Sequence, residues 1–402
     1  MTETTTDADA RRADARTLAA LLRTVRAQTL AIFADYARAI PTLTVPFEPE
    51  LNPPLWELGH VGWFPEFWTV RNSAWRHGAA ADPAAPRSPP RLPGADALYN
   101  SSTVPHAQRW SLTLPSADDT HALLARQLDD TLRLLTQAGP DDDSLYFFRL
   151  ALLHEAMHVE AAIYMAQALG VALRIAGRQP NPLPAPKVLT LGAQSVVLGS
   201  AATGFAFDNE VPARSVALDA FRIDAQPLRW REYLPFVESG CYAHAQLWTP
   251  AGQRWLRQHA PQAPRFLRRA GSGWQQQRLG QWEPLDLDDA ASHLTCHEAE
   301  AWCAWAGRRL PSEAEWECAA RTAGPAFHWG EVWEWTSSTF APYPGFVAHP
   351  YRDYSKPWFG TRRTLRGASS MTSAVMRSPS YRNFFPPERN DIEAGFRTCA
   401  LD

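Results

Sequence analysis

The composition of the chain changes near its middle, and this change restricts the folds that the chain can adopt. Residues 178–187 (RQPNPLPAPK) are rich in proline and fit a linker. Before them, apolar residues recur at a helical period over long stretches. After them come short strand-like pieces separated by Gly, Pro and Asp. Because 402 residues suit two domains rather than one, we expect a helical domain followed by a second domain of mixed structure.

The first half is predicted to be a helical bundle. We expect residues 1–12 to form a disordered tail and the bundle to cover residues 13–177. Helical patterns with caps or proline starts cover residues 13–39, 53–72, 116–137 and a stretch that follows PDDD at 140–143 and ends at Gly170. Four helices joined by short or looped connections are typical of a bundle.

The second half, residues 188–402, is predicted to be an α+β domain rich in irregular structure. Strand-like and helical segments alternate in it, at residues 187–200, 214–224, 230–239, 295–307 and 309–323. From residue 321 onward, aromatic residues, Arg, Gly and Pro are dense and no period is visible. The chain holds 34 Pro and 17 Trp, which fits loops packed against aromatic side chains.

Charge and apolar patterning exclude several partners. Lys and Arg number 39 against 42 Asp and Glu, a net charge of −3, so bulk charge would not hold a nucleic acid or an anionic membrane. No apolar run could span a bilayer, and the N-terminus has no signal-peptide core. Five cysteines without a CxxC pair favour reduced thiols and a cytoplasmic location.

The segment HEAMHVE at residues 154–160 carries the clearest chemical signal. His154 and His158 are four residues apart, so a helix places both imidazoles on one face. Apolar neighbours direct that face into the bundle, where paired histidines without a partner would cost free energy. We therefore predict a metal site. Glu160 lies about 200° around the helix from His158, so we expect it to support the site rather than bind the ion.

A third ligand must come from another helix. His60 is the best candidate, because it lies in a helical stretch among aromatic residues and bundle cores build metal sites from facing helices. The weaker candidates are His77, His106 and His121. Three imidazoles leave about half of an octahedral sphere open, which suits Fe(II) with a substrate and dioxygen, but three histidines also suit Zn(II). The spacing alone does not choose the metal.

The same segment matches the HExxH pattern of zinc peptidases. In that alternative, Glu155 would be the general base of a zinc hydrolase. The pattern is short and occurs in unrelated helices, and the second half has no clear role in a peptidase.

Several segments of the second half resemble the formylglycine-generating-enzyme-like domain, which is similar to C-type lectins. They are GRRLPSEAEWECAAR (307–321), VWEWTSSTF (332–340), LRGAS (365–369) and YRNFFPPERNDIEAGFR (381–397). The paired cysteines of a true formylglycine-generating enzyme are missing, since only Cys399 lies near the C-terminus. The resemblance therefore indicates the fold, which hosts many functions, rather than that activity.

A helical bundle with H-x3-H-x-E joined to such a domain resembles the nonheme-iron sulfoxide synthases of ergothioneine and ovothiol biosynthesis, over residues 15–402. The resemblance implies a DinB-like four-helix bundle and three iron ligands that match His60, His154 and His158. It implies that O2 drives the joining of a chalcogen donor to C2 of the imidazole of hercynine, in a site between the two domains. In the HPYRDYS segment, Tyr351 matches the family's proton- or electron-donating tyrosine, and Tyr354 matches an aromatic residue that receives the trimethylammonium group.

The other contacts with substrate carry over one at a time. Asn383 and Phe384 match an Asn-aromatic pair that contacts hercynine, and Arg109 lies where the family supplies a donor-binding arginine. Met157 stands where a substrate-contacting glutamine is usual. Phe385 replaces the aspartate that holds the amine of γ-glutamylcysteine, although Arg389 is retained.

These departures, with the phrases LNPPLWELGH and SSTVPHAQRW, look most like the selenoneine synthase branch of the family. That branch joins a 1-seleno-sugar to hercynine through a selenoxide. The aromatic pair Phe384 and Phe385 agrees with a neutral sugar, which needs no carboxylate partner. A sulfoxide synthase that uses cysteine or γ-glutamylcysteine remains the alternative.

Overall fold

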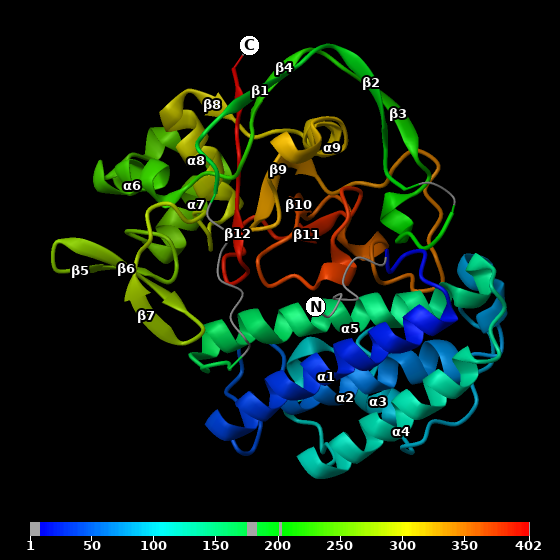
Figure 1. The fold of residues 1–402 in the computed structure, drawn as a ribbon. Helices are drawn as coiled ribbons and strands as arrows, with labels where there is room; N and C mark the ends of the chain where they lie inside the picture. The colour runs from blue at the N-terminus through cyan, green and yellow to red at the C-terminus, as the bar shows by residue number, and fades with distance from the viewer. Residues whose placement is uncertain (1–8, 175–182, 201–202, 402) are drawn as a thin grey trace, which may run out of the picture.

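The computed structural model describes residues 9–174, 183–200 and 203–401, and it places one half of the chain on top of the other (Figure 1). The blue and cyan helices form one layer, and the strands and short helices of the second half lie above them. Helix α5 (Asp142–Leu169) lies along the boundary between the two layers. Residues 178–182, half of the predicted linker, fall outside the described residues.

The predicted helices of the first half are present. Besides α5, they are α1 (Ala15–Ala39), α2 (Pro54–Pro65) and α4 (Ala117–Leu135), and the short α3 (Ala95–Tyr99) was not predicted. Local sequence explains their ends. The side chains of Asp14, Ser116 and Asp141 accept hydrogen bonds from the first turns of α1, α4 and α5. Gly170 ends α5 in the left-handed conformation, with φ +69°. Helix α2 ends earlier than expected, and its chain continues as a π-helical turn, Glu66–Val70.

Helix α5 is buried over most of its length because both of its sides are covered. One side packs on α1 and α2, and the other contacts residues of the second half. A helix covered on both sides needs each buried polar side chain to have a partner, and Glu155 and Glu160 of α5 are paired on opposite sides.

The second half builds several small sheets, in the orders β1-β4-β13-β8, β11-β10-β9-β12, β2-β3 and β5-β6-β7. Their strands are β1 (Val188–Leu191), β2 (Gln194–Leu198), β3 (Arg214–Leu218), β4 (Phe221–Asp224), β5 (Leu267–Ala270), β6 (Gly273–Arg278), β7 (Gln281–Pro284), β8 (Arg308–Arg309), β9 (Trp333–Thr339), β10 (Arg363–Gly367), β11 (Asn383–Phe385), β12 (Ala394–Gly395) and β13 (Cys399–Ala400). The helices are α6 (Trp230–Glu238), α7 (Pro250–His259), α8 (Cys296–Ala306) and α9 (Glu313–Thr322). The meander β5–β7 projects from one side of the molecule (Figure 1).

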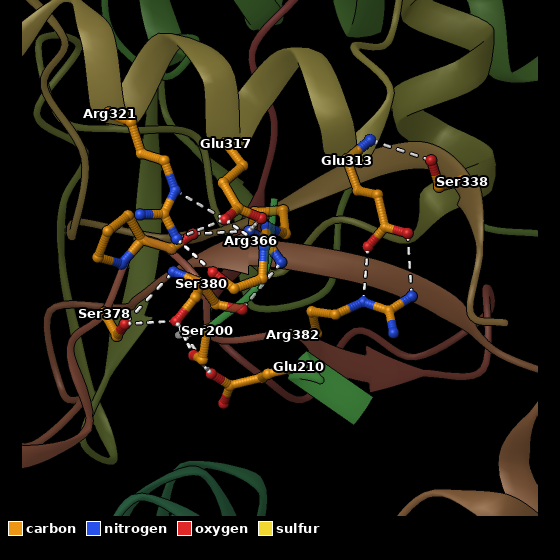
Figure 2. Close-up of polar contacts among 12 residues, drawn as sticks. Ser200, Glu210, Glu313, Glu317, Arg321, Ser338, Arg366, Ser378, Ser380 and Arg382 are labelled. Atoms are coloured by element: carbon orange, nitrogen blue, oxygen red, sulfur yellow. Dashed lines mark hydrogen bonds and ion pairs between the residues drawn. The ribbon is translucent and has the colours of Figure 1, made fainter. Parts of the chain in front are cut away.

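Buried ion pairs hold the irregular core of the second half together (Figure 2). Arg366 of β10 donates to Glu317 of α9 at 2.5 Å, and Arg382 binds Glu313 through two hydrogen bonds of 2.8 and 2.9 Å. Both arginines are fully buried. Such charges stay in a core only when they are paired, so these contacts fix the loops around α9.

Residues 1–8 of the predicted disordered tail lie outside the described residues, but residues 9–12 depart from that prediction. They form a turn in which Ala10 and Arg11 are buried. The guanidinium of Arg11 donates to both carboxylate oxygens of Glu210, at 2.7 and 2.9 Å. No local pattern in the sequence indicates this pair, because its partners are 199 residues apart.

Two further observations bear on the environment of the chain. All five cysteines are buried and free of disulfide bonds. Among the described residues, no helix combines the length and the apolar character needed to cross a membrane.

Candidate metal centre

Three histidines from two helices meet in the core of the first half. His60 of α2 and His154 and His158 of α5 each place a ring nitrogen within 4.8 Å of the others. The Nε2 atoms of His154 and His158 are 3.2 Å apart. His60 and His154 are buried and His158 is partly buried. The helical spacing brings the α5 pair to one face, and the packing of α2 on α5 adds the third ring.

Hydrogen bonds orient two of the rings. The Nδ1 atom of His60 lies 2.8 Å from the carbonyl oxygen of Tyr99, which leaves Nε2 for the centre of the trio. The Nδ1 atom of His158 forms a short hydrogen bond with the carboxylate of Glu57, which is fully buried. Carbonyl and carboxylate partners of this kind are the usual supports of metal-binding histidines.

Burial favours the neutral form of two of the rings, His60 and His154, at neutral pH. Burial, with a contribution from His158, lowers the pKa of His60 to about 3, and burial lowers the pKa of His154 well below its usual value. Burial alone would raise the pKa of Glu57, but His158 and His60 outweigh it and hold that pKa at about 2. Neutral imidazoles at His60 and His154, a third ring at His158 and one carboxylate charge fit a divalent cation, so the residues present match a bound metal.

Tyr351 lies directly beside this trio. Its ring centroid is 6.2 Å from that of His154 and 5.1 Å from that of Phe64. Phe64 in turn stacks on His154 at 3.4 Å. Burial raises the pKa of Tyr351 to about 12, so its phenol keeps its proton at neutral pH. A protonated phenol beside the trio can deliver a proton to a group bound there.

A cavity of about 650 Å³ opens next to Tyr351. It is lined by six of the residues for which a catalytic or substrate-binding role was predicted, namely Arg109, Tyr351, Tyr354, Phe384, Phe385 and Arg389. His106, a weaker ligand candidate, also lines this cavity, and its Nε2 atom lies 2.6 Å from the carbonyl oxygen of Leu51 rather than at the trio. The cavity is large enough for two small molecules.

Two of the predicted substrate contacts do not line this cavity. The side-chain oxygen of Asn383 accepts a hydrogen bond from the backbone N–H of Phe384, at 2.9 Å. The sulfur of Met157 accepts from the hydroxyls of Tyr354 and Tyr381, at 3.7 and 3.4 Å. Met157 therefore contacts the tyrosine that was predicted to receive the trimethylammonium group.

The two glutamates of the HEAMHVE segment point away from the trio. Glu155 binds Arg26 of α1 through both carboxylate oxygens, at 2.7 and 3.0 Å, and also accepts from Thr29. A general base must be free to reach a metal-bound water, so this pairing argues against the zinc hydrolase alternative. Glu160, as expected, is not part of the trio, and it accepts hydrogen bonds from Trp333, Ser369 and Thr372 of the second half.

Sequence reasoning missed two residues of the site. Glu57 could have been found, because it precedes His60 by three residues and so lies on the same face of α2. Tyr381 carried no local signal. Its hydroxyl lies 3.0 Å from that of Tyr354, a contact between segments 27 residues apart.

Comparisons with known proteins cover both halves. The family model of the Sulfatase-modifying factor enzyme 1-like domain matches residues 177–331 and 326–401. The hercynine oxygenase of Mycobacterium tuberculosis is 31% identical over 94% of this chain and 97% of its own length. That of Mycolicibacterium thermoresistibile is 31% identical over 87% of this chain and 88% of its own. The formylglycine-generating enzyme of Bos taurus is 31% identical over 37% of this chain and 44% of its own.

Proposed function

The chain belongs to the hercynine oxygenase family, and from that premise we propose that it is an iron-dependent oxygenase that modifies hercynine. The observation that carries the proposal is the trio of imidazoles beside Tyr351, at the end of a cavity large enough for two substrates. In this proposal His60, His154 and His158 hold Fe(II), and O2 is the co-substrate. The bundle that holds them is proposed to be DinB-like, with domains at residues 13–177 and 188–402 in a cytoplasmic protein.

Bound iron would supply the site at which dioxygen is activated. The protein's own residues would do the rest. Tyr351 holds a proton next to the trio and can transfer it from its hydroxyl oxygen. The aromatic ring of Tyr354 offers a face to a quaternary cation, and Arg109 and Arg389 offer guanidinium groups to an anionic part of a substrate.

We propose further that the second substrate is a 1-seleno-sugar, which would make the product a selenoxide precursor of selenoneine. Support comes from the resemblance of the motifs and from Phe385, whose apolar ring lines the cavity and lies 5.4 Å from the guanidinium of Arg389. Such a wall offers no carboxylate to pair with an ammonium group on the donor. The names of the relatives specify hercynine and no donor, so cysteine or γ-glutamylcysteine stays the second candidate.

A donor competition tests the reaction. Fe(II)-loaded protein would receive hercynine, O2 and equal amounts of selenoglucose, thioglucose, cysteine and γ-glutamylcysteine, and mass spectrometry would identify the products. We expect a dominant adduct of hercynine with selenium. A dominant cysteine or γ-glutamylcysteine adduct would overturn the choice of donor, and no adduct at all would overturn the proposed function.

The variant His154→Ala tests the metal site. Removing one of three ligands should abolish stoichiometric iron binding, measured as metal content after gel filtration. His77→Ala is the matched control, because His77 is exposed and lies outside the trio. Equal iron content in both variants would contradict the assignment.

A further inference from the structure

The loop of residues 349–355 carries both tyrosines of the site, and its two ends are held by buried polar contacts. At its start, the Nδ1 atom of His349 lies 3.0 Å from the hydroxyl of Tyr146, which belongs to α5. At its end, the hydroxyl of Ser355 donates to Asp208 through a short hydrogen bond and accepts from the amide of Asn209 at 3.0 Å. Ser355 is fully buried.

Asp208 faces both ends of this loop. Its carboxylate accepts from Ser355 and also interacts with the backbone N–H of His349. Both contacts favour the charged form of the carboxylate. Its Oδ2 atom is buried and has no partner of full hydrogen-bond geometry. A buried carboxylate oxygen without a hydrogen-bond partner costs free energy of folding. Such a group calls for an explanation, and a functional role is one.

The surroundings of Asp208 contain several titratable groups. Glu210 follows it on the same turn, Tyr146 faces it from α5, and His349 and Tyr354 face it from the loop. Burial raises the pKa of Asp208 to about 6, while Ser355 and the amide of His349 oppose the rise. The carboxylate is thus charged at neutral pH and accepts a proton under mildly acidic conditions.

We propose that Asp208 is a positioning residue that fixes the loop of residues 349–355, and with it Tyr351, against helix α5. Tyr351 stands between the two anchored ends and meets the metal trio only if the loop keeps its shape. We call the contacts of Asp208 with Ser355 and with the backbone N–H of His349 the clamp. A shift of about 1 Å in a reacting group can cost on the order of 100-fold in rate, so the clamp affects catalysis through the position of Tyr351. The catalytic part of this inference rests on the proposed function, whereas the clamp itself does not.

Hydrogen exchange tests the clamp without any turnover. In Asp208→Asn, the amide keeps the size of the carboxylate but loses its charge and one of its acceptors. We expect exchange of the peptide spanning 349–355 to rise on the order of tenfold, with unchanged iron content and no fall in the unfolding temperature, because an unfavourable buried charge is removed. Ser355→Ala should loosen the same peptide. Asp219→Asn removes an exposed carboxylate and is the matched control.

The pH dependence provides a second readout. Ser355 and the backbone N–H of His349 favour the charged carboxylate, so an opening that frees the loop and leaves Asp208 buried loses two contacts that only the charged form needs. Once corrected for intrinsic chemistry, exchange of residues 349–355 in the wild type should therefore rise as the pH falls below about 6, and this rise should be absent in Asp208→Asn. Unchanged exchange of the loop in the variant, or a lower unfolding temperature with faster exchange throughout the chain, would overturn the proposal.

Turnover then tests the link to Tyr351. We expect kcat of Asp208→Asn to fall on the order of 10- to 100-fold with KM for hercynine nearly unchanged. A loosened loop with wild-type kcat would overturn the positioning role. If the wild type itself shows no hercynine turnover, the proposed function fails, and the exchange results still decide whether the clamp exists.

Discussion

At the scale of single residues, the arrangement around His158 shows how the site depends on a carboxylate outside the metal trio. Glu57 is fully buried and bonds the ring nitrogen that faces away from the centre. It fixes the orientation of the ring and makes the imidazole a stronger donor to a cation.

Replacing Glu57 by glutamine should therefore weaken iron binding without removing a ligand. We expect a loss of about 10- to 100-fold in affinity, measured by titration of the apoprotein with Fe(II) under anaerobic conditions. Glu48→Gln, at an exposed position, is the control. The same affinity in both variants would show that Glu57 has no part in the site.

Phe385 allows a residue-scale test of donor choice. In Phe385→Asp, a carboxylate would line the cavity at the position where the resemblance in the sequence predicts one for γ-glutamylcysteine, and it could pair with an ammonium group. We expect the ratio of kcat/KM for γ-glutamylcysteine to that for selenoglucose to rise by about 10-fold or more. A shift in the opposite direction, or none, would mean that another part of the cavity selects the donor.

The sequence predicted these residues unevenly, for physical reasons. The two histidines of α5 could be predicted because residues four apart on a helix share a face. His60 could be predicted because it lies in a second apolar helical stretch, and bundle helices face one another. Tyr381 and Asp208 act through contacts with segments 27 and 147 residues away, which no local pattern encodes.

At the scale of elements, α5 serves two purposes with two of its faces. His154 and His158 face α2, whereas Met157 and Glu160, three residues apart, face the second half. A cavity of about 40 Å³, lined by Glu160 and Glu393 among others, lies between α5 and the second half. The junction therefore contains carboxylates whose ionisation is costly.

The free energy that ionisation of the buried Glu393 costs predicts a stability that depends on pH. Burial raises its pKa to about 7, against the opposing effects of Ser370 and Arg278. Since the unfolded value is near 4.5, the folded state keeps this proton while the unfolded state loses it, so the free energy of unfolding falls as the pH rises from 4.5 to 7. The largest change from this group is on the order of 3 kcal/mol.

Glu393→Gln should remove that part of the pH dependence and should be more stable than the wild type at pH 8. Urea denaturation at four pH values between 5 and 8 measures the effect. Glu388→Gln, at an exposed position, serves for comparison. A variant whose stability still falls with pH as the wild type's does would refute the assignment of the proton to Glu393.

Helices were easier to predict than sheets at this scale. The helices of the first half have a continuous period and capping residues at their ends, and α8 and α9 have capping boxes at Thr295 and Ser312. The meander β5–β7 was missed, because its short, mostly exposed or half-buried strands show no clean alternation of apolar and polar residues. Helix α7 was missed although the sequence carries its start signals, a capping Thr249 followed by Pro250.

At the scale of the whole molecule, the described residues before α1 are tied to the second half. Arg11 pairs with Glu210, and Ser200 and Ser380 donate to the same carboxylate. The pair therefore joins the beginning of the described chain to the core drawn in Figure 2.

Arg11→Ala leaves the buried carboxylate of Glu210 without its cation. We expect a loss of about 3–5 kcal/mol in the free energy of unfolding, measured by denaturant titration. Arg12→Ala is a close control, since its neighbouring ion pair with Asp9 is exposed and should contribute less than about 1 kcal/mol. Similar losses in the two variants would show that the buried pair does not brace the molecule.

The two-faced helix also has a consequence for how the protein is made. During synthesis all three histidines leave the ribosome well before the residues that cover the opposite side of α5, which include Thr372 and Tyr381. Until then, the newly made bundle displays Met157 and Glu160 to water or to chaperones. A nascent chain released early would carry the histidine trio without Tyr351, so the capacity to bind iron would precede the capacity to use it.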